Sequence, residues 1–334
     1  MRVHLLLPAA VVALAATTVA AVGVRAPDAG ADTATATPVL AEAVRATAAA
    51  GIDLDVDVAR HDHPPRSVVT DPDGAWLATF TDGAHTVAVA GEERTFDEPS
   101  ADAGVTTDVW VRLLDAPFDG DVDLAWLRAA LDDREPDVLE IATEYFEGAP
   151  DVRDEDGALI AGEAEYGPLL PDGWRPVGAD WHDFPGVDAT YGSKVDPADP
   201  EEYRALDCSG YVRIVYGFRL GLPLTLRPDG GASLPRRSFE QAAEAPGVVP
   251  IADGELDEAR LQTGDLVFFD APDDGDDRID HVGIHLGVDD DGHHRFIHSR
   301  RSSNGPTLGG DAQGPSILDG EDYFARGFVS TRRL

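Results

Sequence analysis

The sequence is poor in thiols, in lysines and in long apolar runs. Its 334 residues contain one cysteine, Cys208, so an intramolecular disulfide and a zinc site built on several thiolates are both excluded. Lys194 is the only lysine. Apart from the run between Leu5 and Val24, no stretch is long enough and apolar enough to cross a bilayer. In an oxidising compartment, a lone thiol is a liability unless it is buried or used.

Basic residues are scarce as well. Asp and Glu number 63 against 26 Lys and Arg, which gives a formal net charge of −37. A surface this negative repels phosphate backbones and anionic lipid headgroups, so we expect neither nucleic acid nor a membrane surface as a partner. The surplus also keeps a protein soluble at high ionic strength. A saline habitat is therefore one hypothesis, and ordinary solubility is the other.

The N-terminus has the pattern of a secretory signal. Arg2 precedes the 20-residue apolar run, and Ala29-Gly30-Ala31 supplies a small-x-small cleavage site. We expect residues 1–31 to be a signal peptide. An uncleaved anchor is the alternative, because the run is just long enough to span a bilayer. In both cases the rest of the chain lies outside the cytoplasm, with no further membrane contact.

Composition divides the remaining chain into four parts. Residues 32–66 are rich in Ala, Asp and Thr, and Pro64-Pro65 marks them as a linker. Residues 67–150 carry short strand patterns and then two amphipathic helices, which predicts a small mixed β/α accessory module. Residues 151–180 are an acidic, turn-rich connector, and residues 181–334 form the final domain. Within the accessory module we expect strands at 76–80, 86–90 and 108–113, and helices at 124–131 and 137–146.

In the final domain, Cys208 begins a segment with the apolar spacing of a buried helix. A thiol in the first helical turn lies at the positive end of the helix dipole, which would lower its pKa and favour the thiolate. The amides of that turn are candidate oxyanion donors. The alternative is a small buried cysteine that only packs, because free cysteines are commonly buried.

Two strand patterns downstream favour the chemical interpretation. Alternation over residues 280–287 places His281, Gly283 and His285 on one face. The strand that ends near His298 returns beside it and can bring His298 next to His281. A histidine near a cysteine can take its proton, and a second polar residue can hold that imidazole in one tautomer. His285 either lines the cleft or packs.

These pieces together resemble the NlpC-type cysteine peptidases, a family of bacterial cell-wall enzymes. Five motifs occur in the family's order and rough spacing within residues 181–334: Asp207-Cys208-Ser209-Gly210, Leu234-Pro235-Arg236-Arg237-Ser238 with Gln241, Gly264-Asp265-Leu266-Val267-Phe268-Phe269, His281-Val282-Gly283-Ile284-His285-Leu286-Gly287, and Phe296-Ile297-His298. The resemblance implies an α+β, papain-like fold, in which the helix that bears the cysteine packs on an antiparallel sheet.

The resemblance also implies roles for particular residues. Cys208 would be the nucleophile, His281 the base and His298 the residue that orients it. The candidate substrate-binding residues are Tyr191, which matches a tyrosine upstream of the family's cysteine, and Ser209, Gly210 and His285.

The reaction implied by the resemblance is hydrolysis of an amide in peptidoglycan stem peptides, after γ-D-glutamate and before the diamino acid, through a thioester. No metal or cofactor is implied. Peptidoglycan would be the partner, and the protein would be secreted or associated with the cell wall. One alternative is an amidase or acyltransferase that acts on another extracellular substrate. The other is a catalytically silent protein that binds the cell wall.

Overall fold

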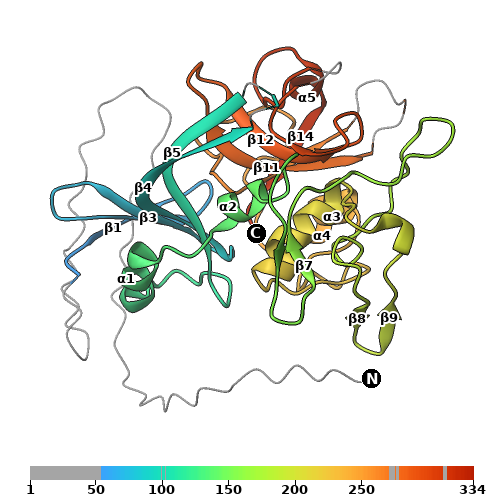
Figure 1. Ribbon diagram of the computed structural model, residues 1–334. Coiled ribbons are helices and arrows are strands. Elements are labelled where there is room, and N and C mark those ends of the chain that lie inside the picture. The colour runs from blue at the N-terminus through green and yellow to red at the C-terminus, as the bar shows by residue number, and fades with distance from the viewer. Residues whose placement is uncertain (1–53, 99, 102, 271–274, 276–277, 311–313) are drawn as a thin grey trace.

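The computed structural model describes residues 54–98, 100–101, 103–270, 275, 278–310 and 314–334. The expected signal peptide and the expected linker up to residue 53 lie outside these residues. The described chain forms two five-stranded antiparallel sheets, with helices packed on them (Figure 1). The α+β class is therefore confirmed as a mixed architecture of helices and antiparallel sheets. In the described part of the chain, no helix combines the length and the apolar character that a membrane span needs.

The N-terminal sheet is a meander in which the strands follow one another in chain order. Its strands are β1 (Asp57–His61), β2 (Arg66–Thr70), β3 (Trp76–Thr81), β4 (Thr86–Glu98) and β5 (Ala103–Leu113). Helix α1 (Leu124–Asp132) packs on this sheet, and Leu127 joins Val69 and Phe80 in a buried cluster. Asp123 begins the helix by accepting hydrogen bonds from its first amides.

Strand β1 lies in residues that we expected to be linker. Leu54, Val56 and Val58 alternate with aspartates, and this period of two places the apolar side chains on one face. Arg60 strengthens the pairing of β1 through a bidentate salt bridge to Asp82, with N–O distances of 2.8 and 2.5 Å. The accessory module therefore begins by residue 57, with a turn at residues 62–65 between β1 and β2. The aspartate-rich composition of this stretch had led us to expect a linker instead of a strand.

The hairpin of β4 and β5 extends past the N-terminal sheet toward the C-terminal sheet (Figure 1). Near its tip, the buried carboxylate of Glu98 accepts three hydrogen bonds from the final domain. The donors are the Thr307 hydroxyl at 2.7 Å and the amides of Leu308 at 2.7 Å and Gly309 at 3.2 Å. The accessory module thus holds the segment 307–309 directly.

The C-terminal sheet has the strand order β13-β12-β11-β10-β14, with every described neighbour pair antiparallel. Its strands are β10 (Leu266–Phe269), β11 (His281–Val288), β12 (His294–Arg300), β13 (Gly305–Thr307) and β14 (Phe328–Arg332). All four residues of β10 are buried. The short helix α5 (Tyr323–Gly327) leads into β14, and its Phe324 packs on Phe269.

Helix α3 (Cys208–Arg213) packs against β11 and β12, and α4 (Ser238–Glu244) lies beside it (Figure 1). The helix expected from Cys208 onward continues as a π-helix, η2 (Ile214–Arg219). Gly210 lets α3 approach the preceding chain closely, because a Cβ there would lie 2.4 Å from the carbonyl oxygen of Ala179. Any larger residue would push the helix away from that chain.

The core around α3 extends into residues that we had placed in the accessory module and the connector. Helix α2 (Val138–Thr143) and strand β7 (Leu159–Ala161) share one buried cluster with α3 and β11. The Tyr211 hydroxyl donates to the carbonyl oxygen of Ala142 at 2.6 Å. Short elements complete the fold: β6 (Val152–Arg153), β8 (Ala189–Tyr191), β9 (Lys194–Asp196) and the 3-10 helix η1 (Pro200–Glu202).

Candidate active site

A cavity of about 310 Å³ lies where the start of α3 meets the start of β11. Cys208 and His281, the first residues of these two elements, both line it. Further lining residues include Tyr166, Val177, Ser209, Arg237, Phe239, Phe269, Arg300, Arg301, Tyr323 and Phe324. The structure therefore brings the predicted nucleophile and the predicted base to one cavity.

The thiol of Cys208 lies against the main chain that carries His281. Its Sγ is 3.9 Å from the carbonyl oxygen of Asp280, and it accepts a hydrogen bond from the amide of Val282. Asp207 fixes the helix start on the other side, because its carboxylate accepts from the Gly210 amide at 2.8 Å. The thiol is thus held against the main chain on both sides of His281.

The electrostatics of the helix start correct one of our expectations. Burial, followed by the charge of the Asp207 carboxylate, raises the pKa of the Cys208 thiol to about 12 against the opposing charge of the Arg236 guanidinium. We had expected the helix dipole to lower this pKa. The carboxylate at the helix start offsets the positive end of the dipole, and the α-helical part of this segment is only six residues long. Cys208 is therefore a neutral thiol that requires a base.

His281 and His298 form a direct pair between neighbouring strands. Nε2 of His281 lies 2.5 Å from Nδ1 of His298, and Nε2 of His298 lies 2.9 Å from the hydroxyl of Ser316. Burial, followed by the charge of Arg300, lowers the pKa of His281 to about 3. Burial, followed by the neighbouring His281, also lowers the pKa of His298 well below its usual value. Both imidazoles are neutral at physiological pH.

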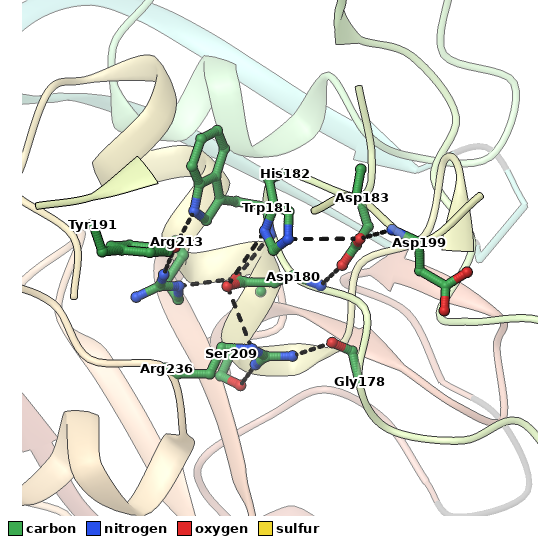
Figure 2. Close-up of polar contacts among 12 residues, drawn as sticks. Gly178, Asp180, Trp181, His182, Asp183, Tyr191, Asp199, Ser209, Arg213 and Arg236 are labelled. Carbon is green, nitrogen blue, oxygen red and sulfur yellow. Dashed lines mark hydrogen bonds and ion pairs between the residues drawn. The ribbon is translucent and has the colours of Figure 1, made fainter. Parts of the chain in front are cut away.

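Two buried arginines support α3 from behind (Figure 2). Arg236 donates to both carboxylate oxygens of Asp207, at 3.1 and 2.8 Å, and to the Ser209 hydroxyl at 2.7 Å. Arg213 donates to Asp180 at 2.9 Å, and Arg236 lies 3.4 Å from the other oxygen of Asp180. Burial alone would raise the pKa of Asp180, but the two arginines bring it below its usual value. The helix start therefore rests on compensated buried charges.

The structure places Tyr191 in this support and Tyr166 in the cavity. The Tyr191 hydroxyl accepts from the Trp181 indole at 2.9 Å and from Arg213 at 2.5 Å (Figure 2). Tyr166 lines the cavity, and burial, followed by the nearby Cys208, raises the pKa of its hydroxyl. Sequence reasoning missed Tyr166, although it is also upstream of Cys208 and Tyr166-Gly167 is the same dipeptide as Tyr191-Gly192.

Of the other predicted substrate-binding residues, Ser209 lines the cavity, whereas Gly210 and His285 do not. Ser209 lines the cavity, but its hydroxyl also donates to Asp207 at 3.1 Å. Gly210 backs onto the chain at Ala179, on the side of α3 away from the cavity lining. His285 is buried, with Nδ1 at 3.1 Å from the carbonyl of Gln262 and Nε2 at 3.2 Å from His294. Of the two roles left open for His285, this environment is that of a packed residue.

Positive charge gathers around the cavity of this strongly acidic protein. Arg237, Arg278, Arg300 and Arg301 all contribute to its lining, alongside Asp207, Asp270 and Asp280. Arginine recognises carboxylate groups well because its planar donors match their geometry. The lining therefore suits a ligand that carries negative groups. Nothing in the composition had indicated this local concentration of arginine.

Within residues 54–334, apart from the undescribed positions, no three His, Cys, Asp or Glu side chains gather as a metal ion would require.

A helix-start thiol beside a histidine pair on an antiparallel sheet is the arrangement used by cysteine peptidases. The model of the NlpC/P60 family matches residues 191–308, so this part of the chain is an NlpC/P60 domain. The family generally comprises cell-wall peptidases. The resemblance inferred from the five motifs is thereby confirmed.

Two solved structures are similar to this chain. An NlpC/P60 family protein of Bacillus cereus ATCC 10987 shares 17% identity, covering 84% of this chain and 80% of that protein, with a TM-score of 0.26. A protein of Staphylococcus aureus subsp. aureus Mu50, described as similar to a lipoprotein of the NLP/P60 family, shares 22% identity, with a TM-score of 0.26. That match covers 46% of this chain and only 38% of the staphylococcal protein. No protein of curated function matches the chain.

Proposed function

We propose that this protein is a cysteine peptidase that hydrolyses amide bonds in peptidoglycan stem peptides. The observation that carries the proposal is the shared cavity of Cys208 and His281, with His298 hydrogen-bonded to Nε2 of the imidazole. The NlpC/P60 domain at residues 191–308 supports the cell wall as the source of the substrate. Export through the N-terminal signal would place the enzyme there.

In the proposed first step, the Cys208 sulfur attacks the amide carbonyl while His281 takes the thiol proton. Because both groups are neutral before reaction, proton transfer accompanies the attack. The carbonyl oxygen becomes an oxyanion. Asp207 already occupies the amide of Gly210, so the amides of Cys208 and Ser209 are the candidate donors to it.

The second half of the reaction returns the protein to its starting state. The imidazolium of His281 gives its proton to the leaving amine, the C–N bond breaks and a thioester forms on Cys208. A water molecule then gives its proton to His281 and attacks the thioester. Release of the free acid returns the proton to the thiol. In this sequence His298 only holds the imidazole in place.

The charge of the lining supports a substrate that carries carboxylates. Stem peptides carry the free carboxylate of γ-linked D-glutamate, and Arg237 and Arg301 lie on the cavity wall where such a group could bind. We therefore propose cleavage between γ-D-glutamate and the diamino acid. In this proposal the accessory module is a positioning unit.

Digestion of purified sacculi, followed by mass analysis of the released fragments, tests the proposal. Wild type is expected to release peptides with a new γ-D-glutamyl C-terminus, and Cys208→Ala is expected to release none while melting like wild type. Fragments cut at another bond would indicate an amidase of different specificity. Binding of sacculi without any release would identify a silent wall-binding protein.

A further inference from the structure

A chain of hydrogen bonds runs from the imidazole of His281 to the backbone of the final domain. After the 2.5 Å contact between the two histidines and the 2.9 Å contact from His298 to Ser316, the Ser316 hydroxyl lies 2.5 Å from the carbonyl oxygen of Gly309. Ser316 and His298 are completely buried, and Gly309 is buried as well. Water therefore does not compete for these bonds, and every hydrogen must have a partner within the chain.

The donor and the acceptor in each of these hydrogen bonds follow from the group at the end of the series, the carbonyl of Gly309. The carbonyl of Gly309 can only accept, so the single hydrogen of the Ser316 hydroxyl points to it. The Ser316 oxygen must then accept from Nε2–H of His298. A neutral His298 carries no second hydrogen, so its Nδ1 accepts from Nε2–H of His281.

This order leaves Nδ1 of His281 with a free lone pair. Nδ1 is the ring nitrogen nearer the main chain, and the thiol lies against the main chain on both sides of His281. The free lone pair of His281 is therefore available to Cys208, and Ser316 determines this through its hydrogen bond to His298.

We propose that Ser316 is a positioning residue that selects the reactive tautomer of His281 through His298. The inference rests on the proposed function, since it assigns a fourth member to that site. The Ser316 hydroxyl accepts a hydrogen bond from His298 and donates one to the carbonyl of Gly309. It therefore has no hydrogen left to donate to His298, and the opposite tautomers are disfavoured.

Removal of the Ser316 hydroxyl reverses the tautomer that His298 and His281 prefer. In Ser316→Ala, Nε2–H of His298 would point at a methyl group, and a buried N–H without a partner costs more than a buried acceptor without one. His298 then keeps its hydrogen on Nδ1 and donates it to His281. The hydrogen of His281 then lies on Nδ1, so this nitrogen can no longer accept the thiol proton.

The accessory module holds the end of this chain of bonds. Glu98, on β4, accepts from the Gly309 amide as well as from Thr307 and Leu308. The acceptor carbonyl of Gly309 is therefore fixed from both sides, by Ser316 and by the N-terminal hairpin. The contact of Glu98 with the segment 307–309 is thus a specific way in which the accessory module could position the site. Glu98→Gln should weaken the preference for the reactive tautomer of His281, but less than Ser316→Ala does.

Histidine ¹⁵N chemical shifts measure the tautomers without any substrate. We expect Nε2–H on both His281 and His298 in wild type and in Thr331→Val, and Nδ1–H on both in Ser316→Ala. Thr331 is the matched control because it is a buried residue of β14 whose hydroxyl accepts from the amide of Ile251 at 3.2 Å. If Ser316→Ala does not fold, Ser316→Cys replaces it, since a thiol has nearly the same size and is a poor acceptor.

Kinetics on sacculi fragments give the second measurement. Ser316→Ala is expected to lower kcat on the order of ten- to a hundredfold, the effect of one unsatisfied buried donor, with KM unchanged. Wild-type tautomers and wild-type kcat in Ser316→Ala would overturn the inference. Inactive wild type with the expected tautomers would instead overturn the proposed function and leave the role of Ser316 intact.

Discussion

Arg236 and Asp207 form a bidentate ion pair directly behind the helix start that carries Cys208. The two N–O distances are 3.1 and 2.8 Å, and both side chains are buried. The same guanidinium also lies 3.4 Å from the carboxylate of Asp180. Arg236 therefore compensates the buried charge of Asp207 and shares the compensation of Asp180 with Arg213.

Loss of this arginine should be costly. Arg236→Ala leaves the buried carboxylate of Asp207 without its cation, whereas Asp180 keeps Arg213, so we expect a loss of about 3–5 kcal/mol in the free energy of unfolding. Arg236→Lys should lose less, because the charge remains while the bidentate geometry does not. Urea denaturation measures both. Arg128→Ala, which removes an exposed pair with Asp132, is the control and should change little. Equal effects at the two positions would contradict the compensation argument.

The two tyrosines should respond differently to loss of the hydroxyl. Tyr166→Phe changes the wall of the cavity, so we expect an altered kcat/KM with little loss of stability. Tyr191→Phe leaves the donors of Trp181 and Arg213 without their acceptor. It should lower the free energy of unfolding by about 1–3 kcal/mol and leave kcat/KM unchanged. A change in kcat/KM for Tyr191→Phe without loss of stability would instead indicate that Tyr191 binds substrate.

Substitutions of His298 test whether it orients the imidazole of His281. His298→Asn and His298→Gln each offer an amide oxygen that can accept the Nε2–H of His281, so both should keep much of the activity. His298→Ala leaves the ring free to rotate and change tautomer, which can cost up to about 10⁴ in rate in catalytic triads. The measurement is kcat at matched thermal stability. An Ala variant as fast as Asn would reduce the site to Cys208 and His281.

Sequence reasoning reached the parts of this molecule that depend on local pattern. The alternation in residues 280–287 and the apolar spacing that begins at Cys208 are local, so the strand and the helix could be predicted. The pairing of Cys208 with His281 followed from the resemblance to the family. The partners of Arg236, Ser316 and Glu98 could not be predicted, because each contact joins segments far apart in the chain. The pKa of Cys208 was misjudged for a related reason, since it depends on burial by distant residues.

Acid should weaken the fold through its buried histidines. Burial lowers the pKa of His285 to about 3 in the folded protein, whereas a histidine in an unfolded chain titrates near 6.5. Between these values the unfolded chain binds a proton that the folded one does not. The contribution of His285 is therefore intact above about pH 6.5 and is lost as the pH falls toward 3.

Urea denaturation of wild type and His285→Gln from pH 7.5 to pH 4 checks this. The stability of wild type relative to the variant should fall by up to about 1.4 kcal/mol per pH unit below pH 6.5. His293→Gln is the control with the opposite sign. The hydrogen bond to Asp319, followed by its charge, raises the pKa of this exposed histidine, so its contribution is lost as the pH rises. A pH-independent difference for His285 would contradict the prediction.

Salt should stabilise the protein. With 63 carboxylates against 26 basic residues, like charges dominate the surface, and salt screens their repulsion with a Debye length of about 10 Å at 0.1 M. We expect Tm to rise between 0.02 and 1 M NaCl. Sucrose at matched osmolality serves as the control, because it stabilises by exclusion and screens nothing. A flat response to NaCl would show that the charges are too dispersed to matter.

The contact made by Glu98 limits how this chain can be recombined. Its carboxylate satisfies three donors of the segment 307–309, and all three belong to the other half of the molecule. A catalytic half joined to a foreign N-terminal partner would keep those donors and lose their acceptor, unless the newcomer brought a carboxylate to the same point. The two halves are therefore not interchangeable parts, and homologous pairs would have to be exchanged together with this hairpin.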